Sequence, residues 1–203
     1  MWALVTDGSI TKIINQPKPL VIGDTQYSRN IFSFRWSNAE REAIGLYEVE
    51  FDNTNKKDEA YYTNTNQTFA FAGGKVTASY GSATAKALDD RNATDDEGVD
   101  LDPVVVIPGL KTNHKRIIKQ QASSELANTD WYITRKADAG TAVPSAVTTH
   151  RAAVRTKSGE METAIDNAAN VDALAALYEY VNTGTEENPV MERPLGAWPV
   201  LEV

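Results

Sequence analysis

Short apolar runs separated by tight turns fill the first eighty residues, a pattern typical of strands. The apolar runs 2–5 and 10–14 flank Asp7-Gly8, and this arrangement predicts a hairpin because both turn positions tolerate positive φ. Further strands are predicted at 20–22, 46–51, 69–71 and 76–80, the last two joined at Gly73-Gly74. Residues 1–85 are therefore predicted to form a β-rich N-terminal module with one short helix.

That helix is predicted to begin at Ser37, a favourable N-cap residue, with Glu40 at the spacing of a capping box. Gly45 is expected to end it. An aromatic cluster precedes the helix and includes Phe32, Phe34 and Trp36. We interpret the cluster as the core of a small domain. The alternative, a ligand platform, has no converging polar group to support it.

Residues 86–110 combine an acidic segment with a short apolar run. Seven acidic residues lie between positions 86 and 102, which indicates a solvated acidic linker. A calcium loop is the alternative, but it needs alternating oxygen ligands and a distal glutamate, which this segment supplies only in part. The run 104–107 then predicts a strand.

The pattern becomes helical in residues 111–183, which we expect to form a separate domain. The first helix has apolar residues Ile117, Ile118, Ala122 and Leu126 at helical spacing. A polar loop containing glycine is predicted to lead from Tyr132 to Val143. A second helix begins at Pro144-Ser145 and extends to about Ala169, with an apolar stripe of Val147, Val154, Met161 and Ile165, and a third covers 171–180.

The simplest packing of these elements is a helical hairpin with Trp131 at its open end. An arginine of the second helix, Arg151 or Arg155, is expected to lie over the Trp131 ring as a cation–π contact of roughly 0.5–2 kcal/mol. Residues 184–203 are predicted to be loop and an apolar tail that carries Trp198. Such a tail docks on its own domain or reaches a neighbouring subunit. The fold class is therefore predicted to be α+β.

Composition excludes several function classes for these 203 residues. The formal net charge of -8 disfavours general binding to nucleic acid, because like charges repel. The absence of cysteine removes thiolate catalysis and disulfides, and fits assembly in a reducing cytoplasm. The N-terminus lacks the features of a signal peptide, and no apolar run approaches the roughly 20 residues that span a bilayer.

Candidate reaction chemistry is also missing from the pattern. The two histidines, His114 and His150, are far apart in sequence, and nothing suggests carboxylates placed to complete a zinc site. His150 is expected to be solvated. No nucleotide-binding or serine-hydrolase motif occurs. We therefore predict a non-enzymatic protein with no cofactor.

One longer pattern resembles a known family. It consists of a Thr-Asp-Trp element, an arginine four residues later, a loop ending in proline, and a helix with two arginines four apart. The residues are Leu126, Thr129, Asp130, Trp131, Arg135, Pro144, Arg151 and Arg155. From Lys111 onward the chain resembles the tail assembly chaperone and tail-fibre assembly families of tailed bacteriophages, and Trp198-Pro199 is similar to the end of that domain.

The N-terminal module carries a second resemblance. The Met-Trp-Ala-Leu-Val start, Trp36-Ser37 with Glu40-Arg41, and Ile44–Tyr47 are similar to small marine-phage proteins of tail-module type. The shorter chaperones lack this module. The resemblance therefore implies a virion component or adaptor of the phage tail, made in the host cytoplasm, which binds tail or tail-fibre proteins as a homo- or hetero-oligomer.

Two alternatives remain open at this point. One is a tail-fibre assembly chaperone that leaves the finished particle, and the other is a module that binds glycans on the host surface. Under the adaptor interpretation, partner binding is expected at aromatic residues of the N-terminal module and the tail, namely Trp2, Phe32, Phe34, Trp36 and Trp198. Asp130, Trp131, Arg135, Arg151 and Arg155 are expected to be a structural motif.

Overall fold

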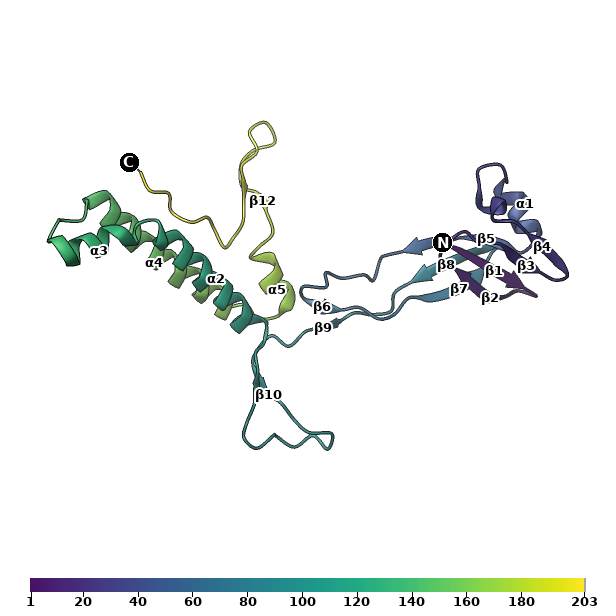
Figure 1. The fold of residues 1–203 in the computed structure, drawn as a ribbon, viewed down its shortest axis with the longest axis horizontal. Coiled ribbons are helices and arrows are strands. Elements are labelled where there is room, and N and C mark those ends of the chain that lie inside the picture. The colour runs from purple at the N-terminus through teal and green to yellow at the C-terminus, as the bar shows by residue number, and fades with distance from the viewer. Residues whose placement is uncertain (203) are drawn as a thin grey trace. The chain divides into compact units, whose positions relative to one another are not determined.

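The computed structural model describes residues 1–202 and has a mixed α+β fold (Figure 1). Strands dominate the N-terminal side, and the long helices belong to the C-terminal half. The chain divides into two compact units, Met1–Thr84 and Ala85–Val203. Within the described residues, none of the helices combines the length and the apolar character needed to cross a membrane.

A curled five-stranded sheet forms the body of the first unit. Its order is β2-β1-β5-β8-β7, from strands β1 (Trp2–Thr6), β2 (Ser9–Ile14), β5 (Leu46–Asp52), β7 (Thr68–Ala72) and β8 (Lys75–Ser79). Neighbours are antiparallel except for β5 and β8, which are parallel. Both predicted hairpins are confirmed: β1 pairs with β2 around Asp7-Gly8, and β7 pairs with β8 around Gly73-Gly74.

Buried side chains collect in two clusters of this unit. Because successive side chains of a strand point to opposite faces, Ala3 and Val5 of β1 join one cluster while Trp2 packs against the other. The first cluster is Ala3, Val5, Val49, Val76 and Ala78, and the second is Ile14, Leu20, Ile31 and Leu46. Phe32 and Trp36 of the aromatic cluster therefore pack on a core, as predicted, whereas the prediction is wrong for Phe34, which is exposed.

Shorter elements complete the first unit. They are β3 (Leu20–Ile22) paired with β4 (Thr25–Tyr27), the 3₁₀ helix η1 (Arg29–Phe32), helix α1 (Asn38–Ala43), and β6 (Tyr62–Thr63) paired with β9 (Thr84–Ala85). The capping box predicted for α1 is confirmed: the Ser37 hydroxyl accepts from the Glu40 N–H, and the Glu40 carboxylate accepts from the Ser37 N–H at 2.7 Å.

Four helices build most of the second unit: α2 (Leu110–Ala127), α3 (Asp130–Ala139), α4 (Ser145–Asp166) and α5 (Val171–Ala176). Helix α2 packs against α4. The stripe predicted for α4 is confirmed, since Val147, Val154, Met161 and Ile165 are all buried. In α2, Ile118 and Ala122 are buried, but Ile117 is exposed.

The loop predicted between Tyr132 and Val143 is wrong over most of its length, because α3 occupies residues 130–139. None of the ten residues of α3 is buried, and its large apolar residues, Trp131 to Ile133, are consecutive and not spaced at the helical period. The available signal was Gly140, which adopts the left-handed conformation typical of a helix C-terminus and donates its N–H to the Lys136 carbonyl.

Two short hairpins also belong to the second unit. Strand β10 (Arg91–Asn92) pairs with β11 (Val106–Ile107), and β12 (Val181–Asn182) pairs with β13 (Met191–Glu192). The strand predicted at 104–107 is thus reduced to its last two residues. Helices α4 and α5 end earlier than predicted, at Asp166 and Ala176, because Asn167 and Leu177 form the C-terminal caps.

Candidate functional site

Arg41 organises the aromatic loop of the first unit. Its side chain is 5% exposed, and its guanidinium donates to the Ile31 carbonyl at 2.8 Å and the Ser33 carbonyl at 2.6 Å. It also donates to the Asn38 side chain and lies 4.8 Å from the centre of the Trp2 ring. A single buried cation therefore fixes the backbone on both sides of Phe32.

The structure separates the aromatic candidates of this loop into two kinds. Trp2 and Phe32 are partly buried and meet edge to face at 5.6 Å, and Trp36 meets Tyr27 in the same way at 6.1 Å. Phe34, by contrast, is 95% exposed. The other three candidates, Trp2, Phe32 and Trp36, pack against the buried cluster. Phe34 is therefore the residue of this set that presents a complete aromatic side chain to a partner.

Arg151 joins the start of α3 to the end of α2. Its Nη1 donates to the Leu126 carbonyl at 2.9 Å and the Thr129 hydroxyl at 2.7 Å, and lies 2.8 Å from an Asp130 carboxylate oxygen. Arg151 is 8% exposed and Thr129 is 2% exposed. Leu126, Thr129 and Asp130 of the sequence pattern that resembles the phage families therefore meet Arg151 of α4 in a largely buried polar contact.

The predicted cation–π contact with the Trp131 ring exists, but the prediction that Arg151 or Arg155 makes it is wrong. Arg135 lies 4.7 Å from the centre of the Trp131 ring and 5.3 Å from that of Tyr132. Arg135 is four residues after Trp131 on the same helix, so the two side chains share one face. Arg151 is occupied with the helix junction, and Arg155 is exposed, with its Nη1 donating to the Arg151 carbonyl. Trp131 is also half exposed, so it is not enclosed by the helices.

His150 contradicts the expectation of a solvated side chain, because it is 8% exposed. It lies on α4 one residue before Arg151. It lines a cavity of about 370 Å³ together with Trp198 and Leu201 of the tail and Glu125 of α2. Its Nδ1 has no hydrogen-bond partner within residues 1–202. The signal was available in the sequence, because position 150 lies three residues after Val147 and four before Val154, on the face of the apolar stripe.

The C-terminal tail docks on the helices of its own unit. Leu195 is 2% exposed, and its N–H donates to the Leu177 carbonyl at 3.0 Å. The Trp198 indole N–H donates to the Gln121 side chain of α2 at 3.3 Å. Trp198 is therefore half-buried against α2, while Val200 near the end is 84% exposed.

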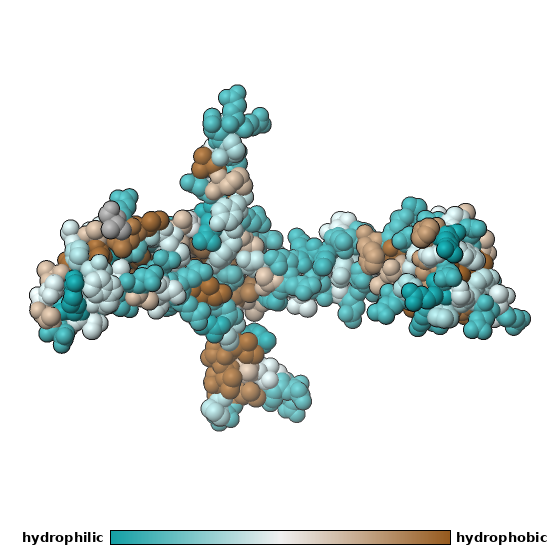
Figure 2. Space-filling model, turned by 45° about the horizontal axis from the view of Figure 1, so that its top comes forward, coloured by the Kyte–Doolittle hydropathy of each residue, from teal (hydrophilic) through white to brown (hydrophobic). Residues whose placement is uncertain are grey.

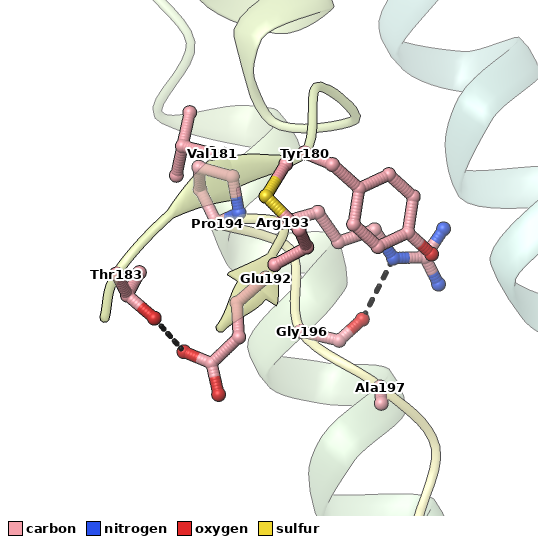
Figure 3. Close-up of a pocket in the computed structure, with 9 residues that line it drawn as sticks. Tyr180, Val181, Thr183, Glu192, Arg193, Pro194, Gly196 and Ala197 are labelled. Carbon is pink, nitrogen blue, oxygen red and sulfur yellow. Dashed lines mark hydrogen bonds between the residues drawn. The ribbon is translucent and has the colours of Figure 1, made fainter. Parts of the chain in front are cut away.

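A cavity of about 520 Å³ lies where the β12–β13 hairpin meets the tail (Figure 3). In its wall the Thr183 hydroxyl donates to the Glu192 carboxylate at 3.1 Å, and Arg193 Nε donates to the Gly196 carbonyl at 2.8 Å (Figure 3). Both charged side chains are thus engaged within the wall. Tyr180, Val181 and Met191 supply apolar surface, which suits contact with an apolar group more than recognition of a charge.

The segment that begins the second unit carries seven acidic residues. Asp90 accepts from the Gly109 N–H at 2.8 Å, and this bond, with the Thr112 hydroxyl, holds the pKa of Asp90 below its usual range. Asp89 pairs with Lys111 at 3.2 Å. These contacts fix the base of the segment on the first turn of α2. Within residues 1–202, no group of three or more His, Asp or Glu side chains is placed to hold a metal ion.

In comparisons with known proteins, no family model, no curated protein and no solved structure matches this chain. The candidate surfaces therefore rest on geometry: the exposed Phe34 of the aromatic loop, the tail around Trp198, and the apolar and acidic segment before α2.

Proposed function

We propose that this chain is a structural or adaptor protein of a tailed-phage virion, which joins tail or tail-fibre components by protein–protein contacts. It is made in the host cytoplasm and assembled into the tail. The phage assignment comes from the pattern around Asp130 and Trp131. The observation that carries the adaptor role is the exposure of large apolar side chains on loops and hairpins that leave the body of each unit, with Phe34 and Val200 as extreme cases.

The contacts around Arg151 support a structural role for the family-like pattern. Its polar groups satisfy one another at the α2–α3 junction instead of facing a substrate. We propose that this junction closes a helical hairpin of α2 and α4. Two ion pairs support that arrangement, Lys115 with Asp166 and Lys119 with Glu162. The later residue of α2 pairs with the earlier residue of α4, so the two helices run antiparallel.

Mass spectrometry of purified virions tests the proposal. The chain is expected in gradient-purified particles at a fixed ratio to the tail proteins, and in tails separated from capsids. Its presence in infected lysate but absence from purified particles would overturn the virion role and favour an assembly chaperone. Retention on immobilised host glycans without incorporation would favour the glycan-binding alternative.

Phe34 offers a sharper test of where partners bind. Phe34→Ser is expected to reduce incorporation into the virion several-fold, because a fully exposed aromatic side chain is a typical anchor at an interface. Val21→Ser, at another exposed apolar position of the same unit, is the matched control and is expected to leave incorporation unchanged. Equal incorporation of both variants would exclude Phe34 as a contact.

A further inference from the structure

The hairpin built from residues 86–109, which we name the acidic arm, exposes an apolar surface of its own. Six apolar side chains on it are between 37% and 59% exposed: Val99, Leu101, Val104, Val105, Val106 and Ile107. Figure 2 shows this brown surface on the projection that carries the label β10 in Figure 1. Together they expose on the order of 500 Å², which is the upper range for the largest apolar patch of a typical monomer.

The acidic arm is held in a defined shape. At its base, Asp89 pairs with Lys111, and Asp90 accepts from the Gly109 N–H. A side chain at Gly109 could not be accommodated, because a Cβ there would lie 2.4 Å from the Asp89 carbonyl oxygen. Near the tip, Asn92 donates to the Asp100 carboxylate at 2.6 Å. The apolar surface is therefore presented by an ordered hairpin, which lowers the entropic cost of binding.

Most of the negative charge on the acidic arm has no cationic partner. Residues 86–109 contain seven acidic residues against two basic ones, a net charge of -5. Asp95, Asp96, Glu97, Asp100 and Asp102 are all exposed, and within residues 1–202 none of these five forms a salt bridge. The acidic arm thus combines an exposed apolar surface with exposed, unpaired negative charge.

We propose that the acidic arm binds an apolar face of a partner protein, and that lysine and arginine flank this face. The apolar side chains supply affinity by leaving water, and the exposed carboxylates select a cationic partner and accelerate the encounter. A second copy of this chain is a poorer occupant. Pairing two arms would bring two charges of -5 within a Debye length, about 8 Å at physiological salt.

A defined probe tests this inference, which rests on the proposed function only in treating the chain as a binding protein. The full chain is titrated against a fluorescein-labelled helical peptide of leucine and lysine, whose apolar stripe is flanked by ammonium groups. A peptide with glutamate in place of every lysine is the control. Saturable binding is expected by fluorescence anisotropy for the lysine peptide alone, and it should weaken between about 50 mM and about 300 mM salt.

Two double variants separate the apolar and the charged contributions. V104T/V106T keeps side-chain shape and is expected to weaken binding at least about fivefold at both salt concentrations. D96N/E97Q is expected to weaken it several-fold at low salt and little at high salt. The matched controls, V21T/V190T and E186Q/E187Q, change exposed valines and carboxylates elsewhere and are expected to stay within about twofold of the unchanged protein.

Three outcomes would overturn the inference. They are no saturable binding by the unchanged chain, equal binding of the arm variants and their controls, and equal affinity for the lysine and glutamate peptides. If sedimentation shows a dimer of the unchanged chain that V104T/V106T abolishes, the arm binds a second copy of this chain and not a partner protein. The virion experiment tests the proposed function and not the arm. The chain can be present in particles while the arm fails to bind the peptide, and the arm can bind the peptide while the chain is absent from particles.

Discussion

At the scale of single residues, two buried arginines have similar roles. Arg41 donates to carbonyl oxygens of the aromatic loop, and Arg151 donates to the Leu126 carbonyl near the end of α2. Each adds charge-assisted hydrogen bonds to backbone carbonyl oxygens where two elements meet. In sequence both belong to patterns that look like sites, and in the structure both hold a junction in place.

Arg151 and Arg155 look equivalent in sequence but differ in burial, and this difference can be tested. Arg151→Met is expected to lower the free energy of unfolding by about 1–3 kcal/mol, because the buried Thr129 hydroxyl loses its donor and the Leu126 carbonyl loses one of its several donors. Arg155→Met, at an exposed position, is expected to cost less than about 0.5 kcal/mol. Urea unfolding of both variants measures the difference, and equal costs would contradict the assignment of Arg151 as the junction residue.

His114 gives the second unit a pH-dependent stability. Its Nδ1 lies 2.8 Å from the Tyr178 hydroxyl, and burial lowers the pKa of His114 from the ordinary value of 6.5. The unfolded chain therefore binds a proton at higher pH than the folded chain does. The contribution of His114 is fully present above about pH 6.5 and is lost as the pH falls toward the folded-state pKa.

His114→Gln keeps a polar side chain opposite Tyr178 and removes this titration. Between about pH 8 and about pH 5 the unchanged protein is expected to lose more stability than His114→Gln, while other titrating groups cancel in the comparison. Chemical denaturation at a series of pH values makes the measurement. Parallel curves for the two proteins would show that His114 does not contribute.

At the scale of elements, the link from α1 to β5 depends on one glycine. Gly45 has a φ of +79°, and a Cβ there would lie 2.4 Å from the Val5 carbonyl oxygen. The Val5 N–H donates to the Gly45 carbonyl at 2.8 Å, so the two backbones are held close together. Gly45→Ala is therefore expected to destabilise the first unit by about 2 kcal/mol or more.

Gly159 is the matched control for that substitution. It lies inside α4, and a Cβ at this position would have no neighbour within 4 Å. Gly159→Ala is therefore expected to stabilise the second unit by about 0.5–1 kcal/mol through higher helix propensity. Thermal unfolding followed by circular dichroism compares the two variants. A neutral Gly45→Ala would mean that the turn can rearrange.

The elements also show which kinds of structure sequence reasoning can reach. The hairpin at Asp7-Gly8 and the capping box of Ser37 depend on residues close in sequence, and both are predictable from it. Helix α3 escapes prediction because its large apolar residues are consecutive and do not repeat at the helical period. The acidic segment is predicted to be a solvated linker, and its apolar residues become informative only because the structure leaves them exposed.

At the scale of the whole molecule, the chain has separate cores in its two units. The clusters around Ala3 and Ile14 lie entirely within Met1–Thr84, and the buried stripe of α4 lies within Ala85–Val203. Each unit therefore has its own source of stability, and substitutions in one are expected to act on that unit alone.

Arg41→Met and Arg151→Met test this independence. Arg41→Met is expected to lower the stability of the first unit, reported by amide hydrogen exchange in its sheet, and to leave protection in α2 and α4 unchanged. Arg151→Met is expected to do the reverse. A loss of protection in both units from either variant would show that they unfold as one cooperative body.

The sequence by itself determined the local elements: the hairpins, the capped helix α1, the buried stripe of α4 and the acidic character of residues 86–109. These follow from turn chemistry, capping and periodicity, which act between near neighbours. Only the tertiary structure decided that Arg151 and His150 are buried, and that Phe34 and the valines of the acidic arm are exposed. Burial depends on what packs over a residue, and those partners lie far away in the chain.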